Sequence, residues 1–123
     1  MKVLKMNRPT FFDVDDTLIL WAPTSTQSAQ FGQMKCDVTG RWFVPYQPNI
    51  VQLLEHKERG HTIVVWSAGG EDWARRAVKL LDLEDYVDFV MAKPQWYYDD
   101  KHAADFMGNP HFISEELYAK RNS

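Results

Sequence analysis

One stretch near the start of the chain, residues 10–19, constrains the fold most. It reads Thr-Phe-Phe-Asp-Val-Asp-Asp-Thr-Leu-Ile, so apolar residues lead directly into a group of carboxylates and then return. Thr10–Phe12 are β-branched or aromatic and suit a short buried strand. Carboxylates crowded after a strand repel one another unless a cation or a basic side chain lies among them. The stretch therefore predicts a site for a hard cation such as Mg²⁺. The alternative is an acidic turn after an edge strand.

A long connection follows, over Leu18–Tyr46. Within it, residues 32–44 predict two short strands around a turn near Asp37–Gly40, which form a hairpin over one side of a sheet. Connections this long inside a compact domain are usually lids or binding loops, so we expect a flap at about residues 20–45. The alternative is a hairpin that only covers the core.

Strand and helix patterns alternate in the rest of the chain. The expected elements are a helix that opens at Pro48 and stops at Gly60, a strand at 61–66, a helix from Glu71 to about Leu81, a strand at 86–91, a short strand at 95–98, and helices at 103–107 and 115–121. This alternation implies parallel strands joined by right-handed crossovers, with helices on both faces. The sequence therefore predicts a single α/β domain over residues 1–123, three-layered and doubly wound around a mainly parallel sheet.

Each polar cluster of the chain follows a predicted strand. The clusters are Asp13 with Asp15, Ser67, Lys93, and Asp99 with Asp100. Because the carboxyl ends of parallel strands meet at one edge of a sheet, we expect these side chains to converge. Carboxylates can hold Mg²⁺ with water, a lysine supplies a positive charge for phosphate oxygens, and a serine at a helix start makes an anion seat. Together they predict a site for a phosphoryl group.

The order of these clusters resembles a known superfamily. Asp13-x-Asp15-x-Thr17, Ser67 after an apolar strand, Lys93-Pro94 and Asp99-Asp100 are similar to the four motifs of the haloacid dehalogenase (HAD) phosphohydrolases. The resemblance covers the chain from residue 10 to about residue 101. The compact segment 93–101 is similar to the Lys-Pro…Asp-Asp-Lys ending of small capless members. The resemblance thus implies a HAD-like Rossmannoid fold with no cap domain.

The resemblance also implies a role for each residue. Asp13 would be the nucleophile that forms an aspartyl-phosphate, and Asp15 would protonate the leaving oxygen and later deprotonate the attacking water. Ser67 would donate to a phosphoryl oxygen, with a helix cap as its alternative role. Lys93 would stabilise the transferring group, with a solvated lysine as its alternative role.

Mg²⁺ is the cofactor that the resemblance implies. The Asp13 carboxylate, the Asp15 backbone carbonyl and Asp100 would bind it, and the ion would neutralise developing charge. Asp99 would lie beside the metal and orient Lys93. The sequence does not decide which of Asp99 and Asp100 is the direct ligand.

Composition limits the classes of partner that can be expected. A net charge of −3 argues against general nucleic-acid affinity, and no apolar run approaches the length of a membrane span. We therefore expect a small phosphorylated substrate and no membrane partner. The single cysteine excludes an internal disulfide and Met1–Met6 lacks the apolar region of a signal peptide, so a cytoplasmic location is expected.

The sequence thus predicts an Mg²⁺-dependent phosphomonoester hydrolase acting through Asp13 on a nucleotide or sugar phosphate. One alternative is a phosphatase of phosphorylated nucleic-acid ends, which a capless site would admit. The other is a non-catalytic phosphate-binding or interaction module. Dehalogenation is disfavoured, because carbon–halogen displacement needs neither Asp15 nor the Asp99/Asp100 pair. The protein is expected to be a monomer or a homodimer.

Overall fold

The computed structural model describes residues 8–22, 34–37 and 39–108. The chain divides into two compact units, Met1–Lys93 and Pro94–Ser123. The helix expected at 115–121 lies outside the described residues.

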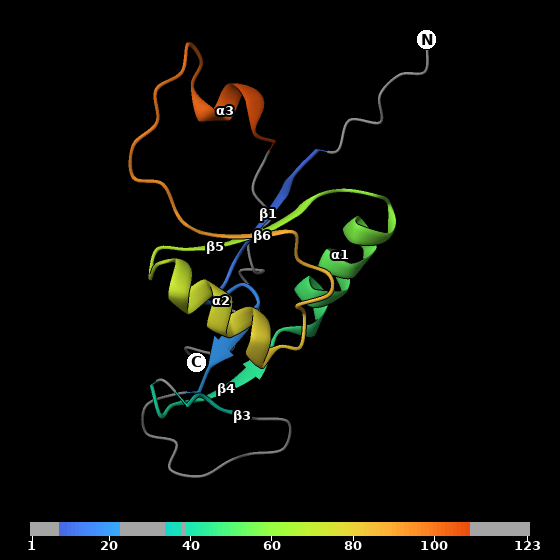
Figure 1. Cartoon of the computed structure of the whole chain (residues 1–123), viewed down its shortest axis with the longest axis vertical. Coiled ribbons are helices and arrows are strands. Elements are labelled where there is room, and N and C mark those ends of the chain that lie inside the picture. The colour runs from blue at the N-terminus through green and yellow to red at the C-terminus, as the bar shows by residue number, and fades with distance from the viewer. Residues whose placement is uncertain (1–7, 23–33, 38, 109–123) are drawn as a thin grey trace, which may run out of the picture. The chain divides into compact units, whose positions relative to one another are not determined.

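A parallel sheet forms the centre of the first unit (Figure 1). It consists of β1 (Thr10–Asp13), β5 (Ile63–Ser67) and β6 (Phe89–Ala92), in the order β1-β5-β6. Asp13 lies opposite Trp66, and Ser67 lies opposite Ala92. The carboxyl ends of the three strands therefore lie side by side, which is the arrangement that brings residues after each strand to one edge of the sheet.

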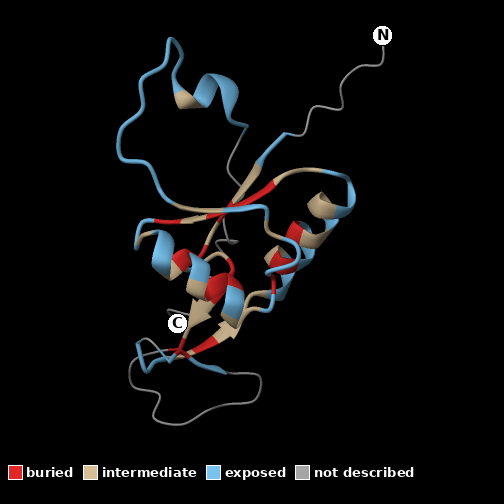
Figure 2. Ribbon diagram, viewed as in Figure 1, coloured by how far each residue is buried: buried red, intermediate tan, exposed pale blue. Residues whose placement is uncertain are grey.

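Two helices pack against this sheet. Helix α1 (Gln47–Glu58) begins with a proline in its first turn, and Gly60 follows its end at a φ of +86°, which a glycine adopts without strain. Helix α2 (Glu71–Leu80) carries two acids in its first turn, where the helix dipole favours negative charge. Apolar side chains of both helices pack in one core with those of the sheet, including Phe12, Ile63, Val65, Leu53 and Ala77. Figure 2 shows buried residues in red on β5 and on both helices.

A small antiparallel sheet adds to the same core. It consists of β2 (Ile19–Trp21), β3 (Met34–Lys35) and β4 (Trp42–Pro45), in the order β2-β4-β3. This confirms the two strands expected around the turn near residues 37–40. Phe43 and Cys36 are completely buried in the same core as the parallel sheet, so the antiparallel sheet is a structural part of the unit, and a role as a flap stays a prediction. The predicted α/β class is confirmed: a parallel sheet packed against helices, a small antiparallel sheet and no cap.

The second unit contains one short described helix, α3 (Ala103–Phe106), as expected. The prediction of a strand at residues 95–98 is wrong, because this segment is irregular. Pro94 has no N–H to donate to a strand ladder, and Trp96 and Tyr98 are 80% and 96% exposed instead of packing on a sheet. Asp99 and Asp100 therefore do not follow a strand. Among the described residues, no helix is both long and apolar enough to span a membrane.

Candidate active site

A tight turn directly after β1 presents the first carboxylates. The backbone carbonyl of Val14 accepts the N–H groups of Thr17, Leu18 and Ile19 at 3.0–3.2 Å, and Asp16 takes a φ of +59°. Val14 and Leu18 have no exposed surface, whereas the side chains on either side of Val14 are only partly buried. The apolar residues thus anchor the turn in the core and leave the carboxyl groups of Asp13 and Asp15 at its surface.

Asp13 and Lys93 meet at the carboxyl edge of the parallel sheet. The Nζ atom of Lys93 lies 3.7 Å from Oδ1 of Asp13, and the two side chains are 40% and 30% exposed. The N–H of Lys93 donates to the carbonyl of Ser67 at 2.9 Å, which fixes the backbone from which the ammonium group extends. An ion pair this exposed contributes little stability. Its importance is that a nucleophile candidate and a cation for phosphate oxygens lie together, as predicted.

Ser67 ends β5 and is completely buried. Its Oγ accepts the N–H of Gly69 at 3.0 Å, and its carbonyl accepts the N–H of Gly70 at 3.1 Å. Gly70, at a φ of +109°, is the N-cap of α2 and makes no side-chain cap bond. Ser67 therefore shapes the turn before the helix instead of capping it. The hydrogen of its hydroxyl group takes no part in the bond from Gly69.

Asp15 is held by two tryptophans. The indole N–H of Trp21 donates to Oδ1 at 2.8 Å, and that of Trp73 donates to Oδ2 at 3.3 Å. These two contacts were not predicted from the sequence. Helical spacing places Trp73 on the apolar face of α2, but no pattern in the sequence indicates the partner of an indole N–H across 58 residues.

Asp99 and Asp100 belong to the second unit, so their membership of the site remains a prediction. Asp99 accepts the N–H of Lys101 at 3.1 Å. A hydrogen bond with the Asp100 carboxyl group, together with that backbone N–H, lowers the pKa of Asp99 below its usual value. Of the residues predicted for the site, Asp13, Asp15, Ser67 and Lys93 lie in the first unit.

The donor chemistry of the first unit fits a magnesium ion held mainly by other oxygens. Among the described residues, no three acidic, histidine or cysteine side chains gather as a set that could hold a metal ion. Mg²⁺ needs no such set, because it keeps several waters and takes only one or two carboxylates together with substrate phosphate. The carboxylate of Asp13, 30% exposed at the edge of the sheet, is the group in the first unit that could serve as one such ligand.

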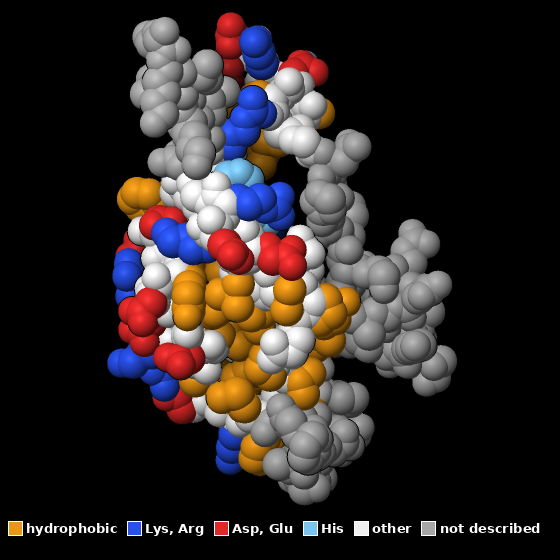
Figure 3. All heavy atoms as spheres, turned by 90° about the vertical axis from the view of Figure 1, so that its right-hand side faces the viewer, with side chains coloured by type: hydrophobic (Ala, Val, Ile, Leu, Met, Phe, Trp, Pro, Cys, Tyr) orange, Lys and Arg blue, Asp and Glu red, His pale blue; other side chains and the backbone are white. Residues whose placement is uncertain are grey.

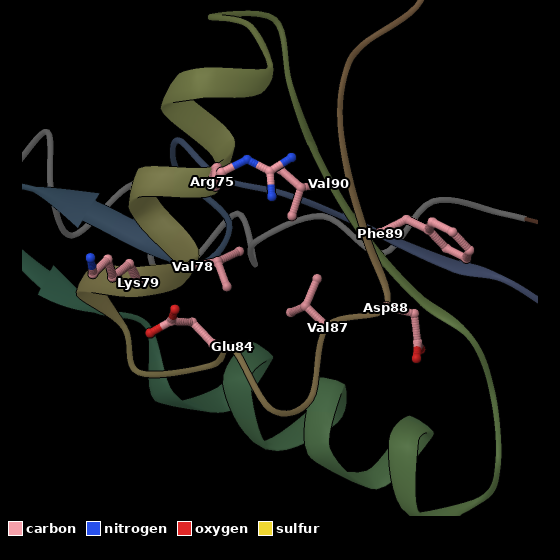
Figure 4. Close-up of a pocket in the computed structure, with 8 residues that line it drawn as sticks. All are labelled: Arg75, Val78, Lys79, Glu84, Val87, Asp88, Phe89 and Val90. Atoms are coloured by element: carbon pink, nitrogen blue, oxygen red, sulfur yellow. The ribbon is translucent and has the colours of Figure 1, made fainter.

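A separate hollow of about 540 Å³ lies between α2 and β6 (Figure 4). Val78, Val87 and Val90 point toward its interior, while Phe89 points away. Charged side chains of both signs also line it, and none of the predicted catalytic residues does. The strand-end edge is therefore the better candidate for the active site, because of the two it alone carries residues that the sequence predicts to be catalytic.

One protein-family model matches the chain. It is that of the NLI interacting factor-like phosphatases, and it matches residues 10–107, a range that includes all of the predicted site residues. No curated protein and no solved structure matches. The family match covers well over half of the chain and confirms the resemblance drawn from the motifs. The chain therefore belongs to the NLI interacting factor-like phosphatases, a family of phosphoric monoester hydrolases within the HAD superfamily.

Proposed function

We propose that the protein hydrolyses phosphate monoesters through a covalent phosphate on Asp13, with Mg²⁺ as its cofactor. The observation that supports this most is the pairing of Asp13 with Lys93 at the carboxyl edge of the parallel sheet, 3.7 Å apart. A carboxylate beside an ammonium group is suited to attack a phosphoryl group whose negative oxygens the ammonium neutralises.

In the first half-reaction, an oxygen of Asp13 attacks phosphorus and the bond from phosphorus to the leaving oxygen breaks. Asp15 gives that oxygen a proton, and Lys93 and the hydroxyl of Ser67 bind the phosphoryl oxygens. In the second, water attacks phosphorus, Asp15 takes a proton from the water, and the bond between Asp13 and phosphorus breaks. We propose that the Asp13 carboxylate, the Asp15 carbonyl and Asp100 hold the metal. When bound, Mg²⁺ would shield Asp13 from the negative phosphate.

We propose a nucleotide or sugar phosphate as the substrate. The net charge of the chain is −3. Around the hydrophobic patch in Figure 3, Lys and Arg side chains lie beside Asp and Glu side chains. A protein that binds a nucleic-acid end usually carries a basic stripe, which the acidic balance of this chain disfavours, so a polynucleotide end is the weaker candidate.

The chemical test is turnover of p-nitrophenyl phosphate with Mg²⁺, with EDTA, and for Asp13→Asn. We expect metal-dependent turnover that falls about 10³-fold or more in Asp13→Asn, because the nucleophile is lost. Asp16→Asn is the matched control: it removes a neighbouring carboxylate, asparagine tolerates the φ of +59°, and activity should persist. Acid quenching with a phosphorus-labelled substrate should leave label on the chain that hydroxylamine releases. Metal-dependent turnover that survives in Asp13→Asn would overturn the mechanism.

The substrate class is tested by comparing kcat/KM for a nucleoside monophosphate, a sugar phosphate, a 5′-phosphorylated oligonucleotide and a phosphoserine peptide. We expect one of the first two to be hydrolysed fastest. A higher kcat/KM for the oligonucleotide or the peptide would replace the proposed substrate but not the mechanism. Phosphate binding without turnover of any of them would support a non-catalytic module instead.

A further inference from the structure

The carboxyl group of Asp15 has an indole N–H on each of its oxygens. Trp21 Nε1 lies 2.8 Å from Oδ1, and Trp73 Nε1 lies 3.3 Å from Oδ2. The donors come from different parts of the first unit, since Trp21 is in β2 and Trp73 is in α2. Their rings stack with centroids 5.7 Å apart and an angle of 21° between the planes. We call Trp21 and Trp73 the indole pair.

Neighbouring groups hold the indole pair in place. Trp21 meets Phe43 edge-on at 5.8 Å between centroids, and the guanidinium of Arg41 lies 4.9 Å from the Trp21 ring centroid. Trp73 lies so close to Gly69 that a Cβ at position 69 would be 3.0 Å from its ring. Both rings are therefore confined by contacts that do not involve Asp15.

We infer that Trp21 and Trp73 are positioning residues that fix the Asp15 carboxyl group for its acid–base work, an inference that rests on the proposed function. A carboxyl group bonded on both oxygens has little freedom to rotate. An indole N–H donates one hydrogen and accepts none, so the indole pair orients Asp15 without exchanging protons with it. Each carboxyl oxygen keeps another lone pair for the proton that passes to the leaving oxygen. Proton transfer needs heavy-atom distances of about 2.6–3.2 Å, so a loss of orientation costs rate.

The alternative is that both tryptophans only pack, and that Asp15 merely satisfies their N–H groups. Trp21→Phe and Trp73→Phe separate the two roles, because phenylalanine keeps an aromatic ring and removes the donor. Trp42→Phe is the matched control: it makes the same change on β4, and Trp42 is not bonded to Asp15. A packing role would lower stability but would affect substrates with good and poor leaving groups alike.

The experiment measures kcat/KM for phenyl phosphate and for 2,4-dinitrophenyl phosphate. In a two-step reaction, kcat/KM for each ester reports the first half-reaction, in which the leaving group departs. Phenoxide needs a proton in order to depart, whereas dinitrophenoxide, a much weaker base, departs almost without one. We expect each indole-pair variant to lose about 10-fold or more on phenyl phosphate, a part of the 10²–10⁴-fold that acid catalysis supplies. On dinitrophenyl phosphate, and for Trp42→Phe on both substrates, we expect little change. Equal losses on both substrates, or no loss on either, would overturn the inference.

A second measurement does not depend on activity. The chain has five tryptophans, so its ¹H–¹⁵N spectrum contains up to five indole signals. Asp15→Ala should shift two of them, namely the two that disappear in Trp21→Phe and Trp73→Phe. If neither shifts, the contact is absent and the inference fails whatever the activity. If the wild-type chain hydrolyses neither ester and none of the four substrates compared above, the proposed function fails and this inference with it. An active wild type whose indole-pair variants lose equally on both esters removes this inference alone.

Discussion

The parallel sheet and the antiparallel sheet of the first unit contribute to the same candidate site in different ways. The parallel sheet positions Asp13, Ser67 and Lys93 through its backbone, because each lies where a strand ends or just beyond. The antiparallel sheet places no predicted catalytic residue in the site and reaches Asp15 through a side chain, the indole of Trp21. The comparison teaches that strand register can place reacting groups, while their orientation depends on contacts made across the fold.

The two sheets also share one core. Phe43 and Cys36 of the antiparallel sheet and its adjoining turn are as fully buried as Ile63 and Val65 of the parallel sheet. A flap that swung freely would expose these side chains to water at a cost of about 1.5–3 kcal/mol for each large one. The antiparallel sheet is therefore expected to unfold with the body of the unit.

The largest loss of stability is expected for a substitution in this shared core. Phe43→Ala should lower the free energy of unfolding by about 3–5 kcal/mol, comparable to the loss from Ile63→Ala in the parallel sheet. Phe89→Ala is the matched control, since Phe89 is 63% exposed on β6 and its removal leaves no buried cavity. Urea unfolding measures all three. A cost below about 1 kcal/mol for Phe43→Ala would show instead that the antiparallel sheet is an independent flap.

A smaller loss of stability is expected at Asp88, whose carboxylate links the start of β5 to the segment before β6. Asp88 accepts the N–H of Ile63 at 2.8 Å and the ammonium of Lys57 at 2.7 Å. Lys57 first, and then the Ile63 N–H, lower the pKa of Asp88 below its ordinary value of 3.8. Asp88→Asn should cost about 1 kcal/mol at pH 7, discounted because the side chains are about one-third exposed.

The pH dependence follows from the direction of that shift. A depressed pKa contributes stability that is fully present above 3.8 and is lost as the pH falls through the lower pKa of the folded state. The difference in unfolding free energy between wild type and Asp88→Asn should therefore shrink below about pH 4. Asp85→Asn, in the same connection, serves as the control. A difference that stays constant down to pH 2 would mean that the charge of Asp88 contributes nothing.

The smallest effect is expected at the surface link between the antiparallel sheet and α2. Arg76 donates to Asp37 through Nε at 3.1 Å and also through Nη2, and this contact lowers the pKa of the Asp37 carboxyl. Asp37→Asn should lower Tm slightly at low salt and not measurably in 1 M NaCl, because exposed charges are screened. Glu71→Gln breaks an ion pair within α2 and is the matched control. A large, salt-independent drop in Tm would make this link a main attachment of the sheet.

Strong local patterns predicted most of the fold. The apolar spacing after Pro48 and the glycine at position 60 indicated α1, and a continuous β-rich run indicated β5. Residues 95–98 misled the prediction because aromatic residues favour strands only where a partner strand and a core are available. Sequence patterns describe propensity along the chain and cannot supply that partner.

The site was predictable only in part, for a related reason. The rule that ligands bind at the ends of parallel strands brings Asp13 near Lys93 without further information. The indole pair depends on how β2 and α2 lie against the first turn, which no spacing in the sequence encodes. Asp99 and Asp100 remain predicted ligands that rest on the motif order.

The position of Cys36 offers a way to time the fold's internal motion. It is the chain's only cysteine and has no exposed surface. A thiol reagent can modify it only after the surrounding side chains separate, so the labelling rate of the native protein reports how often the antiparallel sheet leaves the core. If that rate matches the rate of global unfolding, the two sheets open as one body. A much faster rate would give the free energy of a partial opening without any engineered probe.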